Sequence, residues 1–257
     1  MLFASLAQSV SIASVSAKIH VAALWVFEQQ GSSLNLIEMW GHMGWPARIV
    51  AIVLFLMSAW SMGVMIDRWL AFRAARRQSL QFAPALGGAL REGKIAEAIR
   101  IADRNRKSHL ARVLTSGLQE YHNFDGPAEV ADEKIEASRR ALERTEAIVH
   151  AELERGLSGL ATVGSTAPFV GLLGTVIGII DAFASLGSGG AGMGFSAVSR
   201  GISEALVTTA LGLFVAIPAV MMFNYFSAKI KAFDVEMDNS ASELVDYLLK
   251  RTLLSKG

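Results

Sequence analysis

The sequence lacks cysteine, so it can form neither a disulfide framework nor a thiolate metal site. Its five histidines show no spacing typical of metal ligands, and no metal is expected. Charge is also scarce, because only 18% of the 257 residues are charged while 52% are hydrophobic. Ordinary soluble domains carry about 25% charged residues. Together with a mean hydropathy of +0.40, these deficits exclude an ordinary soluble domain and predict a membrane protein.

Motifs for common enzyme chemistry are missing as well. The chain has no P-loop lysine, nucleophile elbow or metal-binding histidine pair. Residues 187–192 match the dinucleotide pattern G-x-G-x-x-G, but they follow an apolar run rather than a strand and open no βαβ unit. We therefore expect neither an enzyme nor a bound cofactor, and we interpret this segment as a flexible turn.

Three long runs contain no charged residue, and each is long enough for a helix to cross roughly 30 Å of hydrocarbon at about 1.5 Å per residue. These runs are 49–66, 156–180 and 205–228. They predict an all-α integral membrane protein with transmembrane helices at 45–67, 156–184 and 201–228. The uncharged start, 1–17, contains five serines and no cationic beginning, so a signal peptide or a fourth span is the less favoured alternative. Residues 1–44 are expected to be an amphipathic or loosely ordered lead-in.

Basic residues flank these runs unevenly, and this asymmetry predicts the topology. Four arginines at positions 68, 73, 76 and 77 follow the first run, Lys229 and Lys231 follow the third, and the loop 185–200 offers only Arg200. Basic flanks belong in the cytoplasm. A helical domain at 68–155 and a tail at 229–257 are therefore expected there, with the lead-in and the loop on the outer side of the membrane. Arg48 opposes this assignment but is outnumbered.

The predicted cytoplasmic segment is helical in pattern and nearly balanced in charge, which gives no support for nucleic-acid binding. Helical spacing is found at 96–102 and 109–118, and a heptad-like pattern joins Ile135, Leu142 and Val149. With Pro127 in a first turn, we expect one long helix that continues into the second span. A helix that ends near Gly156, followed by a separate span, is the alternative.

Small residues form a narrow stripe on each of the last two spans, at about 100° per residue. The first stripe contains Gly164, Ala167, Gly171, Gly174, Gly178 and Ala182, with Thr175 at its edge. The second contains Gly201, Ala205, Thr208, Thr209, Gly212, Ala216 and Ala219. Such stripes either pack helix against helix or form the inner wall of an oligomer. Pro168 and Pro218 lie inside these spans, where they are expected to kink the helices for gating or for packing.

Glu204 lies beside the second stripe, at the mouth of an uncharged run. A carboxylate that enters hydrocarbon costs a few kcal/mol or more, so it normally faces a protein interior and has a function. Packing alone does not require a charge, so Glu204 favours the oligomeric-wall interpretation. Arg200 lies four residues earlier on the same helical face, and an ion pair with it is the rival explanation.

Two stretches carry a family resemblance: ATVGSTAPFVGLLGTVIGI at 161–179 and GISEALVTTALGLFVAIPA at 201–219. They resemble the ExbB/TolQ branch of the MotA/TolQ/ExbB proton channel family. Three spans rather than four argue against the flagellar MotA branch. The family's polar positions correspond to Thr175, Glu204 and Thr209. Thr208 departs from the pattern, because relatives often have alanine there.

The resemblance implies a bacterial inner-membrane stator, in which several copies, a pentamer by analogy, surround the single transmembrane helices of an ExbD- or TolR-like partner. Proton flow would then transmit force to a TonB- or TolA-like protein that spans the periplasm. Thr175 and Thr209 would hydrate the proton path, with Thr208 beside them, and Glu204 would relay protons. Alternatives left open are a TolQ-like envelope-maintenance motor, a gliding motor and a non-conducting scaffold. Proton is favoured over sodium only through the resemblance.

Overall fold

The computed structural model describes residues 44–124, 131–188 and 194–256, and the predicted lead-in, apart from Gly44, lies outside them. Every regular element in these ranges is a helix. The helices are α3 (Trp45–Arg91), α4 (Ile95–Arg104), α5 (His109–Asn123), α6 (Ala131–Glu154), α7 (Leu157–Ser188) and α8 (Gly194–Lys256). Within the described ranges, three helices are long and apolar enough to cross a membrane, which confirms the predicted three-span, all-α fold.

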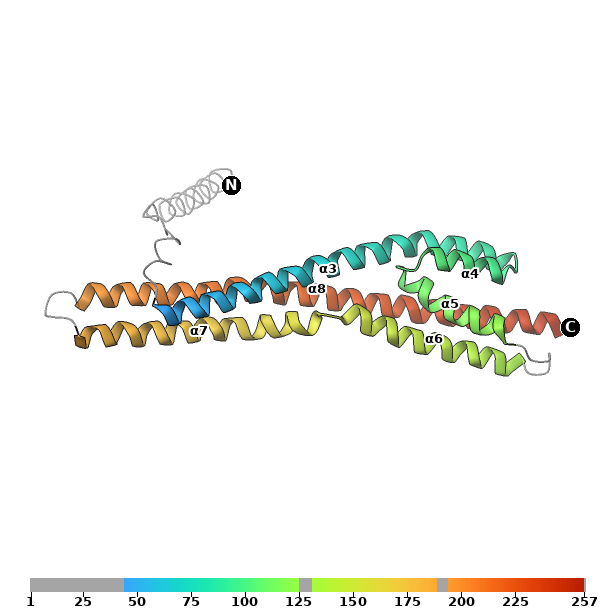
Figure 1. Cartoon of the computed structure of the whole chain (residues 1–257). Coiled ribbons are helices and arrows are strands. Elements are labelled where there is room, and N and C mark those ends of the chain that lie inside the picture. Colours follow the sequence, from blue (N-terminus) through green and yellow to red (C-terminus); the bar gives the residue numbers. More distant parts are fainter. Residues whose placement is uncertain (1–43, 125–130, 189–193, 257) are drawn as a thin grey trace, which may run out of the picture.

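The molecule is elongated and has two halves (Figure 1). In one half the start of α3 packs with α7 and the start of α8. In the other half the remainders of α3 and α8 pack with α4, α5 and α6. Helices α3 and α8 contain 47 and 63 residues and pass from one half to the other without a break. The end of each predicted span at 67 and 228 is therefore a change in composition and not the end of a helix. We call the two halves the apolar half and the polar half.

Local sequence explains where these helices begin and end. Pro46 occupies the first turn of α3, where a missing N–H costs nothing. The same helix ends at Arg91, and two residues later Gly93 has a φ of 73°, which allows the amide of Lys94 to donate to the carbonyl of Ala89 at 2.9 Å. Helix α5 begins after Ser108, whose hydroxyl accepts a hydrogen bond from the amide of Ala111 at 3.1 Å.

The sequence predicted one helix that continues from the polar half into the second span. This prediction is wrong. Helix α6 ends at Glu154 and α7 begins at Leu157. Between them Gly156 has a φ of 83°, a left-handed conformation that is costly for residues with a side chain. The alternative, a helix that ends near Gly156, is confirmed. Pro127 lies outside the described residues.

The loop predicted at 185–200 is shorter in the structure. Helix α7 extends to Ser188 and α8 already begins at Gly194. Gly201, predicted to start the third span, lies about two turns inside α8. Of the flexible turn predicted at 187–192, Gly187 and Ser188 belong to α7, and residues 189–192 lie outside the described residues. The helices on both sides continue further than charge and hydropathy indicated.

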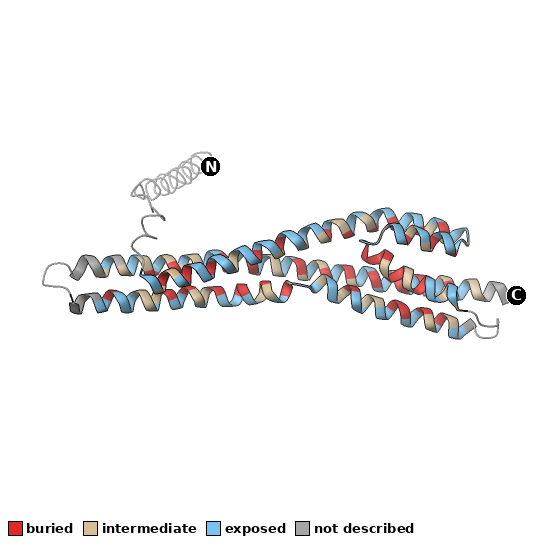
Figure 2. Ribbon diagram, in the orientation of Figure 1, coloured by how far each residue is buried: buried red, intermediate tan, exposed pale blue. Residues whose placement is uncertain are grey.

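Each half has its own core, and red buried positions run along the inner faces in Figure 2. The polar-half core includes Phe82, Leu118, Leu142, Met237 and Leu248, all at most 1% exposed. The helical patterns predicted at 96–102 and 109–118 lie within α4 and α5 and supply residues to this core. The apolar-half core joins the first part of α3 to α7 and α8, so each chain forms a three-helix unit in the membrane.

Candidate functional site

The two small-residue stripes face each other, and the backbones of α7 and α8 meet there. A Cβ atom added to Gly212 would lie 2.7 Å from the carbonyl oxygen of Ala167. One added to Gly171 would lie 2.9 Å from the carbonyl oxygen of Thr208. Only glycine permits this approach, which creates the dispersion contacts on which helix association in lipid depends. The α7–α8 pair is therefore a tightly packed support for any side chain at its edges.

Thr208 lies inside this packing. It is 0% exposed, and its Oγ1 donates to the carbonyl of Ala205 at 2.7 Å. A Cβ at Gly174 would meet Thr208 Oγ1 at 2.7 Å and Val50 of α3 at 3.0 Å, so Thr208 is enclosed by all three helices of the apolar half. A second acceptor, the carbonyl of Gly171, lies 3.4 Å away. The geometry makes Thr208 an interhelical packing residue of one chain.

Thr175 and Thr209 lie on a common edge of the α7–α8 pair. Helix α3 packs against the opposite edge: its Trp60 and Val50 lie beside Gly159 and Gly174 of α7, and it lines a groove together with Leu211 and Val215 of α8. At 100° per residue around the helix axis, Thr175 lies about 100° or more from the residues of α7 that face α3. Thr209 lies similarly far around α8 from Leu211 and Val215. Both threonines are half-buried. Because α7 and α8 are antiparallel, these rotations bring both threonines to the same side of the pair, the side away from α3.

The hydroxyls of these two threonines differ in their hydrogen bonding. Thr175 Oγ1 donates to the carbonyl of Leu172 at 2.7 Å. Thr209 Oγ1 is shielded from solvent and has no hydrogen-bond partner among the described residues. A buried hydroxyl without a partner carries a penalty of about 1–3 kcal/mol. The Thr209 hydroxyl is therefore a polar atom at this edge that the described chain leaves without a hydrogen bond.

Glu204 is half-buried and lies one turn before Thr208 and two turns before Leu211, on the edge of α8 that faces α3. The structure therefore places Glu204 apart from the edge shared by Thr175 and Thr209. Arg200 is one turn earlier in α8, but its side chain lies outside the described residues. Pro168 and Pro218 are both inside helices that continue past them.

A row of hydroxyls that the sequence interpretation missed follows the opposite face of α7. Ser158, Thr162, Ser165 and Thr166 are all exposed. The last three each donate to a carbonyl one turn earlier, at 2.9, 3.1 and 2.6 Å. The spacing 158, 162, 165, opposite the glycine stripe, was a readable signal for this row. Because these three hydroxyls are satisfied by carbonyls of their own helix, the row does not by itself require contact with another chain.

The polar half is tied together by charged pairs that join distant parts of the chain. Arg112 of α5 binds the carboxylate of Glu152 of α6 through both terminal nitrogens, at 2.5 and 2.8 Å. His150 Nδ1 lies 3.0 Å from Asp234 of α8, and that hydrogen bond raises the pKa of His150 above its ordinary value. The sequence did not reveal these pairs, because the two residues of each pair lie far apart in the chain.

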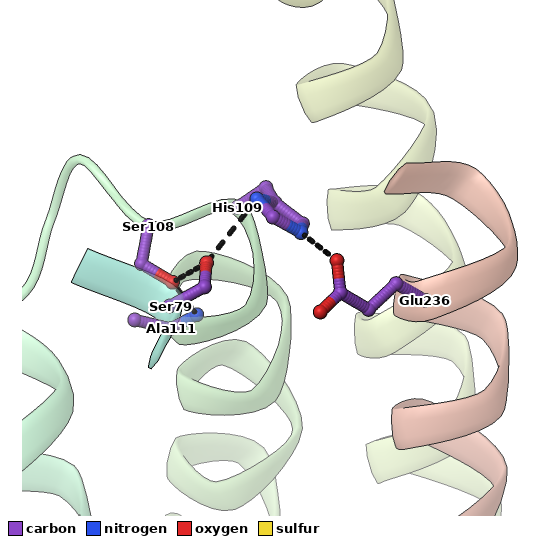
Figure 3. A network of polar contacts seen from close by, with 5 residues as sticks. All are labelled: Ser79, Ser108, His109, Ala111 and Glu236. Atoms are coloured by element: carbon purple, nitrogen blue, oxygen red, sulfur yellow. Dashed lines mark hydrogen bonds and ion pairs between the residues drawn. The ribbon is translucent and has the colours of Figure 1, made fainter. Parts of the chain in front are cut away.

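His109 is the most buried titratable side chain in this network (Figure 3). Its Nδ1 lies 3.3 Å from Ser79 Oγ and its Nε2 lies 3.0 Å from a carboxylate oxygen of Glu236. Burial lowers the pKa of His109, while hydrogen bonding and the negative charges of Glu236 and Asp234 oppose that effect. Within the ranges described, no group of acidic and histidine side chains has the arrangement of a metal site.

These features define a class: a multi-pass helical membrane protein whose last two spans pack through glycines and continue into a polar helical bundle. The profile of the MotA/TolQ/ExbB proton channel family matches residues 105–239, more than half of the chain. The chain belongs to this family.

Individual relatives carry two names. "Biopolymer transport protein ExbB" of Neisseria gonorrhoeae is 30% identical over 79% of this chain and 91% of its own length. "Tol-Pal system protein TolQ" of Pseudomonas aeruginosa is 32% identical over 75% of this chain and 84% of its own. ExbB of Xanthomonas campestris pv. campestris is 46% identical, but that match spans only 42% of each chain.

Proposed function

We propose that this chain is the channel and stator subunit of a bacterial inner-membrane complex that uses the proton motive force, in the manner of ExbB, to drive a TonB-like protein for outer-membrane transport. The observation that carries the proposal is the position of Thr175 and Thr209 on one edge of the rigid α7–α8 pair. Several copies that turn this edge inward would enclose a space lined by hydroxyls.

The surface chemistry of the pair supports assembly with other chains. Large apolar side chains on α7 and α8 are exposed, among them Phe169, Leu172, Leu206 and Phe214, each more than 50%. The hydroxyl of Thr209 is shielded from solvent and has no hydrogen-bond partner among the described residues. Neighbouring copies, lipid and the single transmembrane helix of an ExbD- or TolR-like partner would together supply this cover.

The mechanism follows from the chemistry available at the edge. Hydroxyls neither gain nor lose protons at neutral pH, so Thr175 and Thr209 order water or hydrogen-bond a carboxylate that the partner helix supplies. Protonation of that carboxylate removes the free-energy cost of its charge in the apolar layer. Release of the proton on the other side of the membrane completes the cycle. Glu204 lies on the edge of α8 toward α3, apart from the two threonines, so it acts at the proposed periplasmic mouth of the path, where it relays protons or pairs with Arg200. Thr208 keeps α7 and α8 together while the partner moves.

Proton uptake into vesicles that contain this chain with its partner tests the proposal. Thr175→Val, Thr209→Val and Glu204→Ala should each abolish uptake while the oligomer remains intact by size-exclusion chromatography. Thr208→Val is the matched control, because its hydroxyl lies inside one chain, and it should retain most uptake. Normal uptake in the first three variants would leave the scaffold interpretation.

Two further experiments separate the finer alternatives. Expression in strains that lack either ExbB or TolQ should restore outer-membrane transport in the first more fully than envelope integrity in the second. Because the chain has no cysteine, a single Glu97→Cys change in α4 provides a clean probe of sidedness. An impermeant thiol reagent should label it only after the inner membrane is opened, since the polar half is proposed to be cytoplasmic.

A further inference from the structure

A cavity of about 620 Å³ lies at the junction of the two halves. It takes no part in the proton pathway proposed at Thr175 and Thr209. Its walls come from α3 (Asp67 to Ala75), the start of α5 with the turn before it, and the end of α6. Asp67 is the first charged residue after the apolar run of α3, and Gly156 precedes that of α7. The cavity is therefore at the level where the helices leave the hydrocarbon.

The lining is cationic. It contains five basic side chains, from Arg68, Arg106, Lys107, Arg112 and Arg155, and two acidic ones, from Asp67 and Glu152. The two carboxylates are already occupied, since Arg68 binds Asp67 at 2.6 Å and Arg112 binds Glu152. Because His109 is buried with a lowered pKa, it adds little positive charge at neutral pH. The cavity therefore holds an excess of three positive charges.

Two of these cations have no carboxylate of their own. Neither Lys107 nor Arg155 forms an ion pair in the described part of the chain, and both side chains are exposed. The charge of Arg155 nevertheless adds to the effect of Arg112 in lowering the pKa of Glu152. The backbones of Lys107 and Arg155 are held in place. The amide of Lys107 donates to Gln78 Oε1 at 2.9 Å, and that of Arg155 donates to the carbonyl of Glu152 at 3.3 Å. Both side chains line the cavity, where their charged ends can contact an anion.

The anion's attachment to a lipid follows from the apolar part of the same cavity. Leu70, Ala71 and Ala74 line one wall. Leu70 is 54% exposed and the adjacent Trp69 is 47% exposed, at the interfacial position that tryptophan favours. An apolar wall next to the first membrane-crossing run, beside two cations without an ion pair in the described chain, matches a molecule with a phosphate group and acyl chains.

We propose that this cavity binds the headgroup of an anionic phospholipid, phosphatidylglycerol, from the leaflet next to the polar half. Lys107 and Arg155 contact the phosphate, and Leu70 contacts the first acyl carbons. Because the walls belong to α3, α5 and α6, a bound lipid would brace the junction where α6 ends and α7 begins. The site is separate from the edge that carries Thr175 and Thr209, so it does not depend on the proposed proton pathway.

Lipid retention by the full-length protein tests this proposal. The protein is purified from nanodiscs of phosphatidylcholine with and without phosphatidylglycerol, and bound lipid is counted by native mass spectrometry and titrated with short-chain phosphatidylglycerol. The double variant Lys107→Gln/Arg155→Gln should bind about thirtyfold more weakly, from the loss of two surface cations. Lys107→Arg/Arg155→Lys should bind as the unchanged protein does.

The matched control is Arg73→Gln/Arg76→Gln, which removes two cations from the same membrane-proximal part of α3 but outside the cavity. Retained affinity in this control, with loss in the cavity variant, supports the site. Equal loss in both would mean only general attraction to an anionic surface and would overturn it, as would no loss in either. If glycerol 3-phosphate alone competes as strongly as the lipid, the occupant is a soluble phosphate and the lipid assignment is wrong. Unchanged oligomer size and thermal unfolding exclude misfolding of the variants.

Discussion

His109 Nε2 lies 3.0 Å from the carboxylate of Glu236, although the residues are 127 positions apart. The imidazole also stacks on Phe233, with ring centroids 4.0 Å apart. One side chain of α5 is thereby fixed to the long helix α8 by both a polar and an aromatic contact. Because α8 also forms the third span, this contact connects the polar half directly to the apolar half.

The lowered pKa of His109 predicts acid sensitivity. In the unfolded chain His109 takes up a proton near its ordinary pKa of 6.5, whereas in the folded chain it does so only at lower pH. Its contribution to stability is therefore complete above pH 6.5 and is lost as the pH falls through the folded pKa. Denaturant unfolding in detergent, followed between pH 7.5 and pH 5, should show this decline. His109→Gln should flatten it at a cost of about 1–3 kcal/mol at neutral pH; an unchanged slope would contradict the assignment.

His150 should behave in the opposite way. Its pKa is raised by the hydrogen bond to Asp234, so its stabilisation is complete below pH 6.5 and is lost as the pH rises through the folded pKa. Because the imidazole is 41% exposed, solvent screening keeps the effect small, about 0.5 kcal/mol. Asp234→Asn should remove it, and NMR titration of His150 should show its pKa return toward 6.5. A pKa that stays raised in the variant would point to Glu154 instead.

The close approach of α7 and α8 predicts a sharp difference between two glycines of the apolar half. Gly212→Ala places a methyl group 2.7 Å from a backbone oxygen, so the helices must separate, at a cost of about 1–3 kcal/mol. Gly63→Ala is the control, because nothing lies within 4 Å of its Cβ position. It should be neutral or stabilise α3 by up to about 1 kcal/mol, the ordinary preference of a helix for alanine. Unfolding in mixed micelles measures both; equal effects would refute backbone contact as the cause.

Neighbouring threonines should respond differently to valine. Thr208→Val removes a hydroxyl whose bonds are made within the chain and should cost about 1 kcal/mol with little change in proton uptake. Thr209→Val removes a hydroxyl without a described partner, so it should leave the isolated chain equally or more stable while it abolishes uptake. Stability and uptake measured on the same preparations separate the two effects. Loss of stability in Thr209→Val would show that its hydroxyl is satisfied within the chain.

The break at Gly156 predicts backbone strain on substitution. With φ at 83°, Gly156→Ala should cost about 1–2 kcal/mol, and its Cβ would also meet Val64 at 3.0 Å. The double variant with Val64→Ala removes the steric part and should leave the conformational part. Gly87→Ala, with open space around it, is the control. Thermal unfolding followed by circular dichroism measures the series; full rescue by Val64→Ala would mean that the left-handed conformation costs nothing.

By itself, the sequence determined the features that depend on local composition. Uncharged runs located three spans because hydrocarbon excludes charge, and the small-residue periodicity located the contact between α7 and α8. The stretches around Thr175 and Thr209 were enough to indicate the family. Gly156 was recognised as a place to end a helix, but propensity could not decide, since a glycine also fits inside a helix in lipid.

Only the tertiary structure decided which side of a helix each polar residue occupies relative to α3. Thr208 and Thr209 are adjacent in sequence, yet one is enclosed by three helices and the other lies at the edge away from α3. Glu204 follows the opposite edge, toward α3. Likewise, the contact of His109 with Glu236 and the cationic cavity at the junction arise from residues far apart in the chain. Such contacts depend on how whole helices pack against one another. The periodicity of the sequence describes only the faces of one helix at a time.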